Sequence, residues 1–154
     1  MKAVAMSGLS RIVYCSRSRL TGSRADMEGQ IRQILATARI NNRDAHLTGA
    51  LAFNESCFAQ VLEGSPDDLV GIFARIQRDP RHVDVKILAQ TQPTRRLFPQ
   101  WSMAYAATPD GHGRHPLAHF SFEAALTDGA APAAGQLLDA LRKIVVASSK
   151  PAKV

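Results

Sequence analysis

The chain has 154 residues, of which 45% are hydrophobic and 21% charged, a composition typical of one globular domain with a hydrophobic core. It has no apolar stretch long enough to span a bilayer, and Met1–Gly8 does not resemble a secretory signal, so we expect a cytoplasmic protein. The net charge of +6 would suit nucleic acid, but the arginines are scattered and no aromatic residues interleave with them, which makes nucleic-acid binding a poor interpretation.

The first predicted elements are a strand and a helix. Leu9–Cys15 is a short run of apolar and β-branched residues, which predicts a strand, and the polar segment Ser16–Ala25 predicts a loop. Apolar residues then recur at helical spacing through Met27–Ala38, which predicts an amphipathic helix of about four turns. We expect this helix to end near Asn41 and Asn42, because asparagine favours caps and turns.

A hairpin and a second helix follow. Thr48–Phe53 and Cys57–Leu62 are expected to be strands joined by a turn at Asn54–Ser56. Ser65 is a good helix cap, since proline and two acidic residues come directly after it, and Asp79 before a proline is expected to end this helix. Its expected buried stripe is Leu69, Ile72, Phe73 and Ile76.

The last elements complete the predicted fold. Apolar and polar residues alternate through Val83–Ala89, which predicts a half-buried strand, and Gln100–Ala106 is expected to be a fifth strand. The order βαββαββ, with two helices on one face of a mixed sheet, predicts a ferredoxin-like α+β sandwich. Beyond it we expect a linker over Thr108–Pro116 and C-terminal helices over Phe120–Leu126 and around Leu137–Val145.

The sequence lacks the common motifs of catalysis and metal binding. There is no Walker loop, no G-x-G-x-x-G and no G-x-S-x-G, so we expect no catalytic residues. His112, His115 and His119 are spaced as a loose metal site could be, but they lie in or beside a segment broken by Gly and Pro, so a solvated stretch is the better interpretation and no metal site is predicted. Cys15 and Cys57 are not in a C-x-x-C pair and are expected to be reduced, buried thiols.

Four polar side chains fall where the pattern predicts inward-facing positions. Tyr14 and Gln60 lie on predicted strands among apolar residues, and Asn41 and Asn42 lie at the end of the first helix. Each alone is explained as an ordinary hydrogen-bonded polar group, because buried amides need partners. Together they could converge on a planar heterocycle with donors and acceptors on its edge, such as a flavin ring.

Five ordered segments carry a family resemblance. They are RIVYCS (Arg11–Ser16), ARINN (Ala38–Asn42) followed by LTGAL (Leu47–Leu51), FAQVLEG (Phe58–Gly64), RIQRDPRH (Arg75–His82) and RRLFPQWSM (Arg95–Met103). In these segments the chain resembles the BLUF family, the flavin-based blue-light sensors of bacteria. The resemblance runs from about Leu9 to Ala106, so it implies a flavin-binding photosensor domain over residues 9–106, with residues 107–154 as a linker and helical cap.

The resemblance implies a role for individual residues. Tyr14 matches the tyrosine that donates an electron and a proton to excited flavin, and Gln60 matches the glutamine between that tyrosine and the ring. Asn42 matches the asparagine that pairs with the polar edge of the ring, and Asn41 occupies a neighbouring position. Further positions expected at the flavin are Ile34, Leu35, Arg75 and His82. The pair expected to relay the signal is Trp101 and Met103.

The implied mechanism is photochemical. Light-driven electron and proton transfer from Tyr14 would leave the Gln60 amide with a changed orientation or tautomer, and the absorption of the flavin would shift to the red. The expected cofactor is FAD, with FMN or riboflavin as alternatives. We expect no enzymatic activity, a separate effector protein as partner in trans, such as a cyclic-nucleotide enzyme or a transcription regulator, and a homo-oligomer. Two competing hypotheses are a flavin enzyme and a basic nucleic-acid-binding module without a chromophore.

Overall fold

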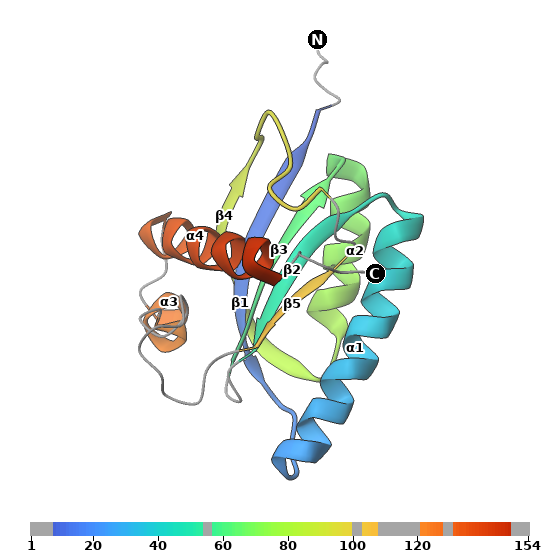
Figure 1. Cartoon of the computed structure of the whole chain (residues 1–154), viewed down its shortest axis with the longest axis vertical. Helices are drawn as coiled ribbons and strands as arrows, with labels where there is room; N and C mark the ends of the chain where they lie inside the picture. The colour runs from blue at the N-terminus through green and yellow to red at the C-terminus, as the bar shows by residue number, and fades with distance from the viewer. Residues whose placement is uncertain (1–7, 54–56, 100–102, 108–120, 128–130, 149–154) are drawn as a thin grey trace.

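The computed structural model describes residues 8–53, 57–99, 103–107, 121–127 and 131–148 (Figure 1). The elements are β1 (Ser10–Ser18), α1 (Arg24–Asp44), β2 (Thr48–Phe53), β3 (Cys57–Gly64), α2 (Pro66–Arg78), β4 (His82–Thr91), β5 (Ala104–Ala107), α3 (Phe122–Thr127) and α4 (Ala131–Ser148). This order confirms the predicted βαββαββ arrangement followed by C-terminal helices. Within the described ranges, no helix is long and apolar enough to cross a lipid bilayer.

The five strands form one mixed sheet in the order β4-β1-β3-β2-β5. All neighbours are antiparallel except β2 and β5, which run parallel. The two central strands, β1 and β3, place Tyr14 directly opposite Gln60. Side chains of directly opposed residues lie on the same face of a sheet, so this register alone brings the phenol and the amide together.

Helices cover both faces of the sheet. Figure 1 shows α1 and α2 on one face and α3 and α4 on the other, and α4 contacts β2, β4 and β5. Two separate hydrophobic clusters result. The cluster under α1 and α2 includes Ile12, Tyr14, Ile31, Leu35, Leu51, Phe58, Leu62, Leu69, Phe73 and Met103. The cluster under α3 and α4 includes Val13, Cys15, Cys57, Ala59, Val61, Leu88, Phe98, Ala125, Leu137 and Leu141.

The first helix is longer than the sequence pattern indicates. It begins with a capping box in which Ser23 and Asp26 bond each other's backbone N–H groups, and it runs to Asp44. Asn41 and Asn42 were expected to end it, but both lie inside its last turns, where the Asn41 carbonyl accepts the N–H of Ala45 at 3.1 Å. The helix therefore ends two residues beyond Asn42, close to the predicted position.

The first strand also extends beyond its predicted end. Ser16–Ser18 was expected to belong to a loop, yet these residues continue β1 because Arg17 and Ser18 pair with Val83 and His82 of β4. A polar segment can remain a strand where a neighbouring strand takes up its backbone hydrogen bonds.

The fourth strand does not follow the simple alternation predicted for it. Val83 and Ile87 were expected to face the core but are 39% and 43% exposed, whereas Leu88 is buried. β4 is an edge strand, its register with β1 shifts in two places, and Asp84 has a φ of 58°. Each irregularity turns the side chains relative to the sheet, so a period of two does not hold along the whole strand.

Several expectations fall on residues outside the described ranges. These are the turn at Asn54–Ser56, the first part of the predicted fifth strand with Trp101, the linker over Thr108–Pro116, and the three histidines 112, 115 and 119. The start and end of α2 and the presence of two C-terminal helices are confirmed: Ser65 caps α2 and Asp79 ends it.

Candidate functional site

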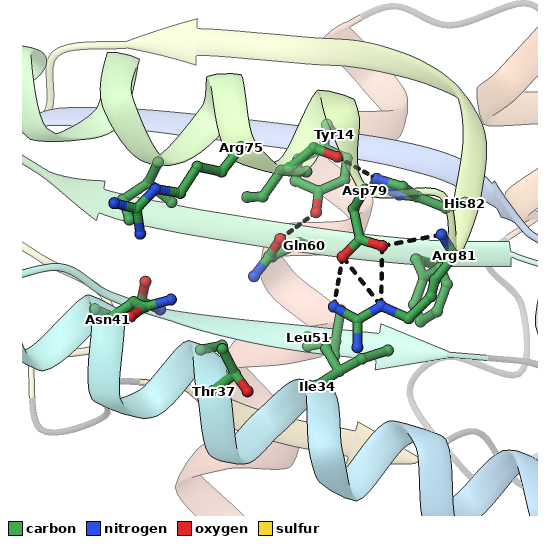
Figure 2. A pocket seen from close by; sticks show the side chains of 15 residues that line it. Tyr14, Ile34, Thr37, Asn41, Leu51, Gln60, Arg75, Asp79, Arg81 and His82 are labelled. Carbon is green, nitrogen blue, oxygen red and sulfur yellow. Dashed lines mark hydrogen bonds and ion pairs between the residues drawn. The ribbon is translucent and has the colours of Figure 1, made fainter.

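A pocket lies between α1, α2 and the face of the sheet that they cover (Figure 2). It encloses about 790 Å³ of space, including the part at its mouth that is open to solvent. Its lining residues are Tyr14, Ile34, Thr37, Ala38, Asn41, Asn42, Leu51, Phe58, Gln60, Ile72, Arg75, Ile76, Asp79, Arg81 and His82.

The structure brings most of the sequence-predicted site residues to this one pocket. The lining contains both photoactive candidates and the candidates Ile34, Asn41, Asn42, Arg75 and His82. Leu35 lies in the hydrophobic core under α1, and not among the lining residues. Met103 is buried in the same cluster and contacts Gln60, while Trp101 lies outside the described residues.

Tyr14 and Gln60 are joined by a hydrogen bond on the floor of the pocket. The Tyr14 hydroxyl donates to Oε1 of Gln60, as Figure 2 shows. Burial raises the pKa of Tyr14, because a phenolate would lose its hydration, and the negative charge of Asp79 raises it further. Tyr14 is therefore a neutral phenol, which has a proton to donate to the amide.

The other end of the Gln60 amide meets a sulfur atom. Nε2 of Gln60 donates to Sδ of Met103 at 3.5 Å. A thioether can accept a hydrogen bond but cannot donate one, so it favours the NH₂ end of the amide over the oxygen end. Tyr14 and Met103 together therefore define which way the Gln60 amide points.

His82 forms part of the wall beside Tyr14. Its Nε2 lies 2.6 Å from the carbonyl oxygen of Ile76, and its Nδ1 lies 2.7 Å from Oγ of Ser16. Because a carbonyl only accepts, Nε2 must carry a proton. Both ring nitrogens are thus engaged within the protein, and His82 ties the end of α2 to β1 while its ring stands edge-on to Tyr14 at 6.3 Å.

Asp79 and Arg81 are site residues that the sequence analysis missed. Both line the pocket, and the Arg81 guanidinium binds the Asp79 carboxylate through Nη2 at 2.5 Å and Nε at 2.9 Å. This hydrogen bonding lowers the pKa of Asp79, so the carboxylate stays charged and accepts hydrogen bonds only. The sequence did hold one indication of them: Asp79 and Arg81 directly follow the helix whose last turn carries Arg75, itself a predicted site residue.

The chemistry of the lining suits a planar heterocycle. Ile34, Leu51 and Ile72 supply apolar surface, while the amides of Asn41 and Gln60 offer both donors and acceptors. An isoalloxazine ring is flat and apolar over its faces and carries carbonyl and N–H groups on one edge, so the residues present fit a flavin. Among the described residues, no three His, Cys, Asp or Glu side chains gather closely enough to hold a metal ion.

A shallow, open depression adjoins the mouth of the pocket. It is lined by Arg75, Arg78, Asp79, Pro80 and Arg81, three of which also line the pocket itself. Arginine is well suited to phosphate groups because its planar guanidinium can donate two parallel hydrogen bonds. The opening of the pocket is therefore positively charged on the side of α2.

The chain is similar to several known proteins. The chain is 31% identical over 107 residues to the photoactivated adenylate cyclase subunit beta of Euglena longa, a match that covers 69% of this chain and 12% of that protein. The curated relatives are thus much longer than the part they share with this chain. Two similar solved structures are the ground state of BlsA, with a TM-score of 0.72, 26% identity and 87% of each chain covered, and the dark state of BlrB, described as a BLUF protein.

The BlrB structure has a TM-score of 0.69 and 26% identity, and the match covers 91% of this chain and 96% of BlrB. The family profile of BLUF, described as sensors of blue light using FAD, matches residues 9–104. This match spans more than half of the chain and includes the whole of β1, β2, β3 and β4 and the first residue of β5. The chain therefore belongs to the BLUF family.

Proposed function

We propose that the chain is a blue-light photoreceptor that holds a flavin non-covalently in the pocket between α1 and α2. The observation that carries this proposal is the buried hydrogen-bonded series from Tyr14 through Gln60 to Met103 on the floor of a pocket that suits a flat heterocycle. Membership of a family of blue-light sensors supports it.

Tyr14 is the proposed source of the electron and the proton. When bound, the flavin supplies a strong oxidant on absorbing blue light. Tyr14 is a neutral phenol whose pKa is raised by burial, and loss of an electron makes a phenol strongly acidic. Its hydroxyl already donates to Gln60, so the proton has a direct route to the amide as the electron leaves.

Gln60 is the proposed switch. An amide has a donor end and an acceptor end, so turning it over, or shifting its tautomer, exchanges hydrogen bonds at both ends without moving the backbone. Such a change alters the bond to Tyr14 on one side and to Met103 on the other. The signal relay through Met103 and Trp101 stays a prediction, with the contact between Gln60 and Met103 as its support.

Other lining residues have proposed roles in holding the cofactor. Asn41 and Asn42 at the end of α1 would pair with polar groups of the ring, and Ile34 would pack on its face. Arg75 lies on α2 at the border of the pocket and the positively charged depression. Leu35 would pack behind these lining residues, and His82 would fix the wall of the pocket.

The proposed cofactor is FAD. The arginines at the mouth suit a phosphorylated tail, which favours FAD and FMN over riboflavin. The family description names FAD. Extraction of the bound flavin and separation of the three forms by chromatography identifies it directly.

The proposed output is a contact with a separate effector protein in the cytoplasm, by a chain that forms a homo-oligomer and has no enzymatic activity of its own. A cyclic-nucleotide enzyme or a transcription regulator is the kind of partner we expect. The chain matches part of a protein named a photoactivated adenylate cyclase subunit, which supports an enzyme of this kind as the effector. In this proposal residues 9–106 form the sensor, and residues 107–154 form the linker and the helical cap.

The experiment that tests the function compares Tyr14→Phe and Gln60→Leu with the wild type. Both variants should bind flavin, because each keeps the shape of the pocket floor, and both should lose the light-induced red shift in absorption. Gln33→Leu is a matched control, since Gln33 is exposed on α1. A wild-type photocycle in either pocket variant would contradict the assigned roles.

A stability control separates photochemistry from folding. Leu69→Ala should lower the free energy of unfolding by about 2–5 kcal/mol, because Leu69 is buried in the cluster under α2 without lining the pocket. The red shift should remain. Ile72 shares the same helical stripe but would be a poor control, because it lines the pocket.

A further inference from the structure

Arg39 reaches from α1 to the start of β5. Its Nε donates to the backbone carbonyl of Met103 at 2.9 Å. Arg39 itself is exposed on the outer part of α1, whereas the Met103 side chain is only 1% exposed. One residue, Met103, is therefore held from two sides, by a helix through its carbonyl and by Gln60 through its sulfur.

Arg39 binds the backbone at Met103, which precedes the first residue of β5 that pairs with β2. Parallel pairing between β2 and β5 begins with Ala50 opposite Ala104, one residue after Met103. A hydrogen bond from a charged guanidinium is stronger than one between neutral groups. Arg39 therefore fixes the backbone of Met103 just before the first paired residue of β5.

The position of Met103 matters because its sulfur only accepts hydrogen bonds. With Nε2 of Gln60 facing Sδ, the pair forms a hydrogen bond, and Oε1 of Gln60 remains for the Tyr14 hydroxyl. A reversed amide would place Oε1 against Sδ, two acceptors with no proton between them. A sulfur held firmly in place therefore disfavours the reversed amide.

We propose that Arg39 is a positioning residue that biases the orientation of the Gln60 amide by fixing Met103. This inference rests on the proposed function, in which that orientation is the photochemical switch. When Gln60 turns over in the light, the repulsion between Oε1 and Sδ acts on Met103, and the hydrogen bond from Arg39 connects that residue directly to α1. Arg39 thus couples the buried switch to an exposed helix.

The test uses two variants at position 39 and a control on the same helix. Arg39→Leu removes the donor, and Arg39→Gln restores an N–H at the same number of bonds from Cα without the charge. Arg32→Leu removes an exposed arginine two turns earlier on α1, where the structure gives it no bond to β5. Leucine, glutamine and arginine have similar helix propensities, so α1 should form equally well in all of these proteins.

Two measurements report on the positioning. In the dark, the Met103 methyl resonance of protein labelled at its methionine methyl groups should move in Arg39→Leu. It should move less in Arg39→Gln, whose neutral N–H makes a weaker bond, and should stay near its wild-type position in Arg32→Leu; Met103→Leu assigns the signal. After blue light, recovery of the dark spectrum should slow about fivefold in Arg39→Leu, because a loosened sulfur disfavours the reversed amide less.

The outcomes separate this inference from the proposed function. An unmoved Met103 methyl resonance and an unchanged recovery rate in Arg39→Leu would overturn the role of Arg39. If Arg39→Gln or Arg32→Leu changed the methyl resonance and the recovery rate as much as Arg39→Leu does, the role of Arg39 would be overturned as well. The cause would then be the loss of a positive charge and not the loss of this hydrogen bond. The methyl resonance is recorded in the dark, so it decides the role of Arg39 in fixing Met103 even if the wild type shows no light response, which would contradict the proposed function alone.

Discussion

At the scale of single residues, burial decides what Tyr14 and Gln60 can do. A phenol exposed to water could exchange its proton with solvent, but the Tyr14 ring lies in the core and its hydroxyl faces an amide. Gln60 is a polar side chain in a buried strand, and it is tolerated because both ends of its amide have partners. The same two partners make its orientation well defined, which a two-state hydrogen-bond switch requires.

The raised pKa of Tyr14 predicts a dependence of stability on pH. In the unfolded chain tyrosine ionises at about pH 10, but in the folded chain burial keeps Tyr14 protonated to higher pH. Its contribution to stability is therefore complete below pH ~10 and falls as the pH rises above that value. The free energy of unfolding of the wild type should decline relative to that of Tyr14→Phe over this alkaline range, as denaturant titrations at a series of pH values would measure. Parallel curves for the two proteins would contradict this account of Tyr14.

At the scale of elements, a buried carboxylate holds the connection between β4 and β5. Glu63 on β3 is fully buried and accepts the backbone N–H groups of Leu97 and Phe98, each at 3.0 Å. It also pairs with Nε of Arg11 on β1 at 2.8 Å. These bonds place Phe98 in the cluster under α4, five residues before Met103 on the other face of the sheet.

Loss of the Glu63 charge should destabilise this connection. Glu63→Gln would leave the Arg11 guanidinium without its ion pair and, with the amide oxygen kept on the backbone N–H groups, would turn an NH₂ group toward Nε of Arg11, so we expect a loss of about 3 kcal/mol in the free energy of unfolding. Chemical denaturation measures it. Glu28→Gln on the exposed surface of α1 is the matched control and should change little. Equal stability of Glu63→Gln and the wild type would show that the carboxylate does not anchor this segment.

The order of elements and the central pair of the site were predictable from the sequence, because they depend on local patterns. Alternation placed Gln60 on a buried strand face, and Ser65 marked the start of α2. The exposure of Val83 and Ile87 was not predictable, because it results from register shifts between β1 and β4 that no local pattern encodes. Asp79 was read only as a helix stop, since its pairing with Arg81 and its place at the pocket arise from the tertiary fold.

At the scale of the whole molecule, the sheet separates the pocket from a second layer of helices. One face, under α1 and α2, carries the pocket and its polar floor, and the other is closed by α3 and α4 over an apolar cluster that includes the buried thiols of Cys15 and Cys57 (Figure 1). β1 and β3 lie between these layers and contribute residues to both. Phe98 is buried in the cluster under α3 and α4 and Met103 in the cluster under α1 and α2, so these two residues, close in sequence, belong to different layers.

The most direct test of the central claim is the absorption spectrum of the purified chain before and immediately after blue illumination. If the pocket holds a flavin over the Tyr14–Gln60 pair, the dark protein should show a flavin spectrum, and light should shift it to the red with full return in darkness. A colourless protein, or a bound flavin whose spectrum stays unchanged or only bleaches, would contradict the account.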